Sequence, residues 1–113
     1  MKRHQEKRPW GEFDRFTLNE ISSVKIITVN PKKRLSLQYH HKRREFWRIL
    51  DNPVKVTVGN KTYVAKKDDE VIIPVKTKHR IEGLSKKARI LEISLGTFDE
   101  KDIVRLEDDF NRK

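Results

Sequence analysis

Residues 38–45 read Gln38-Tyr39-His40-His41-Lys42-Arg43-Arg44-Glu45. Gln38 and His40 stand two positions apart in a strand-like run, so their side chains point to the same face of a strand. Glu45 follows beyond a polar turn and can return to the same point from the neighbouring strand. Nitrogen and carboxylate ligands that meet from separate strands allow a β-barrel to hold a divalent metal.

A second stretch reads Pro74-Val75-Lys76-Thr77-Lys78-His79 and supplies one histidine after a proline turn. The turn ends an apolar run, so His79 would reach the pocket from a distant strand. Taken singly, each histidine also fits a structural or exposed position. Together, the two stretches predict a metal-dependent site for a small molecule.

The hydrophobic pattern predicts β-strands almost throughout the chain. The predicted strands cover residues 24–29, 35–40, 45–50, 54–58, 61–65, 71–73, 79–81 and 88–95. Gly59-Asn60 is typical of a hairpin turn between the fourth and fifth of them. Short strands at this spacing indicate an all-β sandwich or barrel rather than βαβ units.

The alternation within two strands predicts which side chains face inward. Ser36, Gln38 and His40 share one face of the second strand. Glu45, Trp47 and Ile49 share one face of the third. The ligand candidates are therefore expected on interior faces.

The two ends of the chain differ from this pattern. Residues 1–8 are basic and are expected to form a mobile arm. In the tail, Ile103, Leu106 and Phe110 have helical spacing, which predicts a short C-terminal helix within residues 99–110. With 113 residues, the chain is expected to form a single domain over 1–113.

The composition narrows the class of protein. There is no cysteine, which excludes disulfides and thiolate chemistry. No long apolar run occurs, so we expect a cytoplasmic protein with no membrane partner. The net charge of +10 leaves nucleic-acid binding as a charge-driven alternative, but aromatic residues do not interleave with the basic ones as a stacking platform requires. We therefore expect no nucleic-acid partner.

The motifs resemble those of the cupin superfamily, with Gln38-x-His40-x4-Glu45 as the first and Pro74-x4-His79 as the second. The chain is still more similar to the C-terminal cupin domain of type II mannose-6-phosphate isomerases, which is often fused to a mannose-1-phosphate guanylyltransferase. The segments that carry this resemblance are Arg8-Pro9-Trp10-Gly11, Arg34 to His41, Glu45-Phe46-Trp47, Ile73-Pro74, His79-Arg80 and Asp102 to Phe110.

The resemblance implies a cupin fold, a double-stranded β-helix or jelly-roll barrel. It implies a divalent metal held by Gln38, His40, Glu45 and His79. It also implies isomerisation of mannose 6-phosphate and fructose 6-phosphate through an enediolate. Zn²⁺ suits these ligands, as do Mn²⁺, Co²⁺ and Fe²⁺.

The reaction needs groups for proton transfer, and the candidates are Glu45 and His41. The substrate's phosphate needs cations, for which we expect Arg80 and Arg105, followed by Lys78 and Arg43. Solvated positions for Lys78 and Arg43 are an alternative. Arg105 could instead pair with Asp108 or Asp109.

The sequence departs from the family pattern at several positions. Phe46 and Lys42 replace histidines, which could remove a helper for proton transfer or substrate binding. Lys32, Asn52 and Lys76 stand where cupin motifs usually have glycine, so these turns must form without it.

The alternative to an isomerase is a non-catalytic cupin that binds a sugar phosphate or nucleotide sugar and works with a separate guanylyltransferase. Another cupin enzyme, such as an oxygenase or epimerase, is also compatible with the fold alone. An exposed barrel edge at the N-terminal strands would pair with a second copy, so we expect a homodimer.

Overall fold

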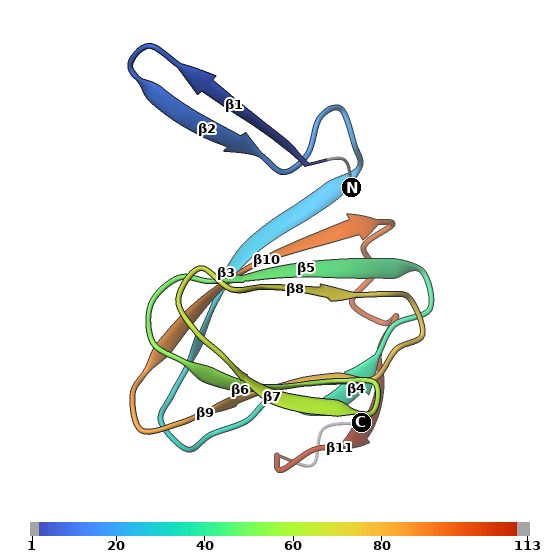
Figure 1. The fold of residues 1–113 in the computed structure, drawn as a ribbon. Coiled ribbons are helices and arrows are strands. Elements are labelled where there is room, and N and C mark those ends of the chain that lie inside the picture. The colour runs from blue at the N-terminus through green and yellow to red at the C-terminus, as the bar shows by residue number, and fades with distance from the viewer. Residues whose placement is uncertain (1–2, 111–113) are drawn as a thin grey trace.

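The computed structural model describes residues 3–110, and its regular elements are all β-strands (Figure 1). In chain order they are β1 (His4–Arg8), β2 (Gly11–Arg15), β3 (Ser22–Val29), β4 (Leu37–Tyr39), β5 (Arg43–Ile49), β6 (Val54–Val58), β7 (Lys61–Ala65), β8 (Glu70–Ile73), β9 (His79–Gly83), β10 (Ala88–Gly96) and β11 (Val104–Glu107). Within residues 3–110, no helix has the length and apolarity needed to cross a membrane.

Two antiparallel sheets face each other and form the body of the molecule (Figure 1). One has the strand order β3-β10-β5-β8 and the other β11-β4-β9-β6-β7. The hairpin of β6 and β7 turns at Gly59-Asn60, where the sequence predicted it. The all-β sandwich or barrel expected from the strand spacing is confirmed.

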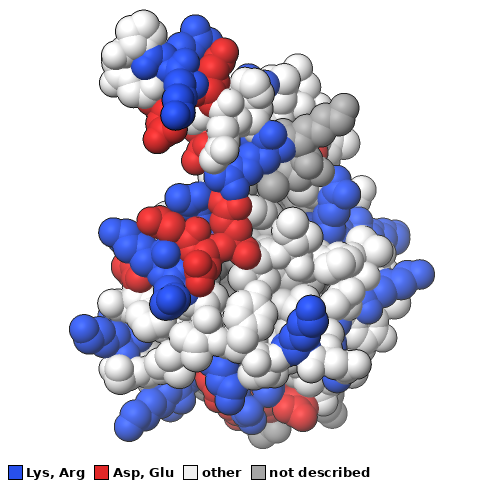
Figure 2. Space-filling view, viewed as in Figure 1, with Lys and Arg blue, Asp and Glu red and all other residues white. Residues whose placement is uncertain are grey.

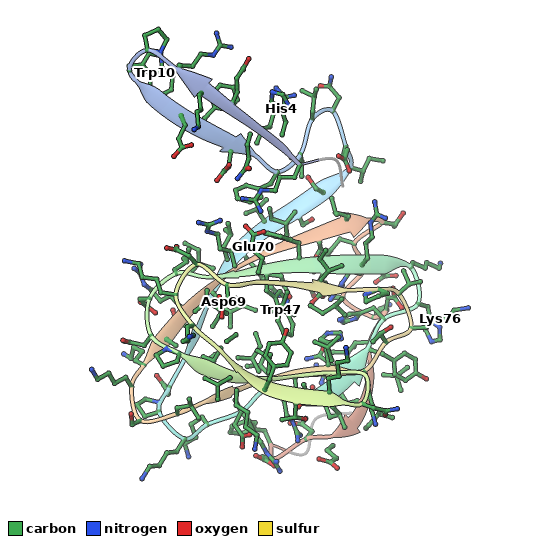
Figure 3. The ribbon with its side chains drawn as sticks, in the orientation of Figure 1. His4, Trp10, Trp47, Asp69, Glu70 and Lys76 are labelled. Atoms are coloured by element: carbon green, nitrogen blue, oxygen red, sulfur yellow. The ribbon has the colours of Figure 1, made fainter. Side chains whose placement is uncertain are left out.

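The apolar core lies between the sheets because alternate residues of each strand point inward. Trp47 and Ile49 of β5 are buried there, on the face that Glu45 shares, as predicted. Figure 3 places Trp47 in the interior between the two layers. Phe46 points the other way and packs with Ile93 on the outer side of the four-stranded sheet.

The strand registers divide the interior into an apolar end and a polar end. Ile49 of β5 lies opposite Ile90 of β10, while Glu45 lies opposite Ser94. In the other sheet, His79 lies opposite Gln38 of β4. The polar side chains from both sheets therefore gather at the end of the barrel where β5 begins.

The tail is a strand, and the prediction of a C-terminal helix within residues 99–110 was wrong. β11 pairs antiparallel with β4 and completes the edge of the five-stranded sheet. The pairing satisfies backbone groups of β4 that a tail helix would leave without strand partners, and it outweighs the weak helical spacing of three apolar residues. Ion pairs of Arg80 with Glu107 and of Arg34 with Asp109 hold the tail in place.

The expected basic arm at residues 1–8 is partly structured. His4–Arg8 form β1, which pairs with β2 in a two-stranded hairpin that projects from the barrel (Figure 1). Trp10 lies at its tip and is 73% exposed (Figure 3). Met1 and Lys2 lie outside the described residues.

The basic side chains on the face shown in Figure 2 are spread over that face. On the face shown in Figure 2, Lys and Arg side chains stand apart from one another, with acidic side chains between the hairpin and the barrel. The basic residues do not form a continuous stripe on this face. The positive charge on this face is therefore not concentrated in one patch.

Two of the turns that lack glycine adopt the backbone that glycine would favour. Lys32 has φ of 59° and Lys76 has φ of 58°, both in the left-handed region. A side chain there costs about 1–2 kcal/mol because Cβ approaches the following carbonyl oxygen. Asn52 is not among the residues with positive φ.

Replacing Lys32 with glycine should therefore stabilise the protein. Relief of the left-handed strain outweighs the added freedom of the unfolded chain, so we expect Lys32→Gly to raise the free energy of unfolding by about 0.5–1 kcal/mol. Urea denaturation measures the change. The matched control is Lys33→Gly at the next exposed position, whose φ is not positive, and it should destabilise by about 0.5–1 kcal/mol. A loss of stability in Lys32→Gly would contradict the presence of left-handed backbone strain at Lys32.

Candidate metal centre

Three buried side chains converge at the polar end of the barrel. His40 follows β4, Glu45 lies in β5 and His79 begins β9, and their exposed fractions are 3%, 2% and 3%. One ligand atom from each lies within 4.8 Å of the others. They line a pocket of about 50 Å³, which we call the inner pocket. This space suits an ion and a water molecule rather than a sugar.

Both histidines present Nε2 to this centre. The Nδ1 atom of His40 lies 2.6 Å from the carbonyl oxygen of Asp102, and that of His79 lies 2.9 Å from the carbonyl oxygen of Thr77. A carbonyl only accepts, so Nδ1 carries the proton in each ring and Nε2 keeps its lone pair. Burial, as the largest effect, lowers the pKa of His79 and favours the neutral form that a metal requires.

The Glu45 carboxylate lies between the two rings. Its Oε2 is 3.2 Å from His40 Nε2 and its Oε1 is 3.5 Å from His79 Nε2, while Trp47 Nε1 donates to Oε1 at 3.2 Å. Burial alone would raise the pKa of Glu45, but hydrogen bonding, with the neighbouring Glu92 carboxyl among the partners, outweighs it and holds the pKa well below its usual range. The carboxyl is therefore ionised.

The donor set fits a divalent metal. Two neutral imidazole nitrogens and one carboxylate are ligands for Zn²⁺ and for other first-row metals. Gln38 lines the same pocket and lies opposite His79 in the sheet, so its amide oxygen is the candidate for a fourth ligand. The structure thus brings together the four residues singled out in the sequence.

Glu92 of β10 is a site residue that the sequence analysis missed. It lines the inner pocket, accepts a bond from Trp47 Nε1 at 3.3 Å and pairs with Lys25 Nζ at 3.2 Å. Burial, together with the neighbouring Glu45, raises the pKa of Glu92 to about 7. The available signal was a charged residue on the same strand face as the apolar Ala88 and Ile90.

A second space, the outer cavity, adjoins the inner pocket and has a volume of about 400 Å³. Lys25, Leu35, Gln38 and Arg43 line both spaces, so a molecule in the outer cavity has access to the metal ligands. The size is in the range of small-molecule sites. The remaining lining residues are Ser36, Phe98, Glu100, Ile103 and Arg105.

Of the four predicted phosphate-binding cations, the structure places two beside the outer cavity. Arg43 and Arg105 line the outer cavity. Arg80 lines the inner pocket, but its guanidinium donates to the Leu35 carbonyl and to Glu107, each at 2.9 Å, and so ties β9 to the tail. Lys78 lines neither space.

The other residues singled out in the sequence lie outside both spaces. His41 is exposed, and its ring packs edge-on against Tyr39. Phe46, which departs from the family pattern, belongs to the outer side of the sheet, and Lys42 is exposed. The two departures therefore leave the lining of the inner pocket intact.

The C-terminal segment takes part in the centre through Asp102. Its carbonyl oxygen accepts from His40, and its carboxylate accepts from the backbone amides of His41 and Lys42 at 2.9 Å each. These two hydrogen bonds, the first of them the larger effect, lower the pKa of the Asp102 carboxyl. They fix the position of the carbonyl that orients the His40 ring.

Comparison with known proteins identifies one matching family and several relatives. The family described as "Mannose-6-phosphate isomerase C-terminal" matches residues 1–108. The alginate biosynthesis protein AlgA of Pseudomonas aeruginosa is 38% identical over 107 residues, and the mannose-1-phosphate guanylyltransferase RfbM of Salmonella typhimurium is 37% identical over 110. These matches cover 93% and 94% of this chain but only 22% and 23% of the relatives. The chain thus spans less than a quarter of their length.

The fold is that of known cupins. A cupin protein from Bacteroides fragilis superposes with a TM-score of 0.62 at 18% identity, over 71% of this chain and 69% of that one. At this identity the likeness concerns the fold alone. It confirms the jelly-roll barrel implied by the motifs.

Removing the Asp102 side chain should loosen the metal centre without unfolding the barrel. We expect Asp102→Ala to weaken Zn²⁺ or Co²⁺ affinity by about 10–100-fold, because the carbonyl that orients His40 loses its two anchors. Titration calorimetry measures the affinity. The matched control is Asp51→Asn, since Asp51 also accepts two backbone amides but in the turn between β5 and β6. Unchanged metal affinity in Asp102→Ala would contradict a role of the tail in the metal centre.

Proposed function

The chain belongs to the mannose-6-phosphate isomerase C-terminal family, and from this membership we propose that it is a metal-dependent isomerase that interconverts mannose 6-phosphate and fructose 6-phosphate. The observation that carries the proposal is the convergence of His40, Glu45 and His79 beside a cavity large enough for a hexose phosphate.

The inner pocket would hold the metal through His40, Glu45, His79 and Gln38. Zn²⁺ is the ion these ligands suit best, and Mn²⁺, Co²⁺ and Fe²⁺ are compatible with them. A bound divalent ion supplies Lewis-acid stabilisation of negative charge on the substrate's oxygens. The protein's part is to turn both imidazoles so that Nε2 faces the pocket, which the Asp102 and Thr77 carbonyls do.

Aldose–ketose isomerisation moves a proton between C2 and C1, so an acid–base group must face the sugar. Glu45 faces the inner pocket and remains a candidate, although it is also a ligand. Glu92 is a second candidate on position alone, because its carboxyl lines the same pocket. His41 would need to turn inward from its exposed position beside Tyr39.

A second candidate function is a cupin without catalysis that binds a sugar phosphate or nucleotide sugar beside a separate guanylyltransferase. The observation in its favour is that RfbM is named a mannose-1-phosphate guanylyltransferase and is far longer than this chain. Retention of the buried donor set favours the isomerase, since a binding module has no need of it. The position of Phe46 outside the pocket also removes one reason to doubt catalysis.

The setting we propose is the cytoplasm, in the supply of mannose units for polysaccharides. Two of the relatives are named for alginate and xanthan biosynthesis. A homodimer is part of this proposal. β3 is an edge strand of its sheet, and its outward Val24 and Ile26 are 61% and 55% exposed.

The isomerase proposal is tested by turnover of mannose 6-phosphate in the presence of Zn²⁺, Mn²⁺ or Co²⁺ and after chelation. We expect metal-dependent formation of fructose 6-phosphate that the chelator abolishes. His79→Ala should lose both metal binding and turnover, because one of three buried ligands is gone, whereas His4→Ala in the projecting hairpin should lose neither. Metal binding without turnover would favour the binding module, and turnover unaffected by chelator would refute the metal mechanism.

The dimer is tested by light scattering after size-exclusion chromatography. We expect twice the chain mass for the native protein and the chain mass for Ile26→Lys, because a charge at the pairing edge opposes association. Thr62→Lys on β7, the edge strand of the other sheet, is the control and should remain dimeric. A native monomer would refute this part of the proposal.

A further inference from the structure

Arg43 occupies the position that a metal ion would compete for. Its Nη2 lies 3.2 Å from His40 Nε2, and its Nε lies 3.3 Å from Glu45 Oε2. Because His40 Nδ1 donates to a carbonyl, Nε2 has one lone pair and here accepts from the guanidinium. The same lone pair cannot serve Arg43 and a metal at once.

Charge leads to the same conclusion. A guanidinium within hydrogen-bond distance of two ligand atoms would stand next to a divalent cation in a buried pocket, where repulsion between like charges is strong. In this position the guanidinium compensates the buried Glu45 carboxylate, which would otherwise be costly. Arg43 is therefore favoured at this position when no metal is bound and disfavoured there when a metal is bound.

The Arg43 side chain can move into the outer cavity. Arg43 already lines it, and its guanidinium carbon lies 4.4 Å from the centre of the Phe98 ring, which lines the same cavity. Lys25 and Arg105 add two more cations to the lining, against one carboxylate, that of Glu100. A space with this balance attracts an anion.

A buried hydroxyl strengthens the assignment. The Ser36 side chain is 1% exposed and lines the outer cavity, and its Oγ has no hydrogen-bond partner among residues 3–110. Buried polar groups are rarely left without partners unless a ligand or water completes them. A phosphate oxygen would accept the hydrogen bond that this hydroxyl can donate.

We propose that Arg43 holds the cation position in the metal-free protein and swings into the outer cavity when the metal binds, where it completes a phosphate subsite with Lys25, Arg105 and Ser36. The identity of the anion as the substrate's phosphate group rests on the proposed function. The subsite also explains how loading of the metal prepares the protein for its substrate. Metal and anion then favour each other's binding, and by linkage the two enhancements are equal.

The experiment uses the full chain, with Mn²⁺ and inorganic phosphate as probes, in titration calorimetry without turnover. We expect bound Mn²⁺ to tighten phosphate binding about tenfold, and phosphate to tighten Mn²⁺ binding by the same factor. In Arg43→Gln the affinity for Mn²⁺ should rise, because the competing cation is gone, and the coupling should disappear. Arg105→Gln should weaken phosphate binding with the Mn²⁺ affinity unchanged.

The matched control is Arg44→Gln, which removes the same charge from the adjacent exposed position of β5 and should change neither affinity. Coupling that persists in Arg43→Gln would mean that phosphate binds to the metal directly, and it would overturn the proposal. A loss of Mn²⁺ affinity in Arg43→Gln would overturn it as well, because Arg43 would then support the ligands.

The outcome is separable from that of the isomerase assay. Coupling without turnover would support the subsite and count against the isomerase. Turnover without coupling would overturn the subsite and leave the isomerase standing.

Discussion

The buried carboxylate of Glu45 is the group to which the polar end of the barrel is adapted. An anion removed from water is tolerated in a protein interior only when hydrogen bonds or charges compensate it. Here Trp47 and Arg43 donate to it from β5, while His79 of β9 and His40, just after β4, face it from the other sheet. The sheets must therefore meet in this register, because a shift of β5 by one residue would turn Glu45 outward and bring Phe46 into the pocket. The apolar end of the barrel supplies the stability that allows this arrangement.

Much of the fold could be predicted from alternation, because alternation has a direct cause in strand geometry. Ser36, Gln38 and His40 were expected on one face, and all three line the two spaces of the site. The pairing of β11 with β4 could not be predicted, since three apolar residues at helical spacing also suit a strand once a sheet edge lacks a partner. Glu92 was missed because it belongs to neither of the two motifs, and a single charge in a strand is not a signal of a site. The position of Arg80 likewise depended on Glu107, a residue on a strand that the sequence did not predict.

The two adjoining spaces differ in size, and the size of each limits what it can bind. The inner pocket, at about 50 Å³, excludes a sugar, while the outer cavity, at about 400 Å³, is lined by cations and by Phe98. Only Lys25, Leu35, Gln38 and Arg43 border both. Coupling between the proposed ion and the proposed ligand would therefore pass through few side chains, and of the two cations among them, Arg43 is the one that contacts the candidate ligand atoms of His40 and Glu45.

The bond between His40 and the Asp102 carbonyl joins positions 62 residues apart in the chain. Domains are synthesised from the N-terminus, and contacts of such separation form late. On a ribosome, the three buried candidate ligands His40, Glu45 and His79 are all present once residue 79 has been added, but the carbonyl that orients the first of them is not. A nascent chain would thus contain ten of the eleven strands within residues 3–110 before it contains the carbonyl that completes the proposed metal centre. The order of synthesis would therefore delay capture of the proposed metal until the tail has been added.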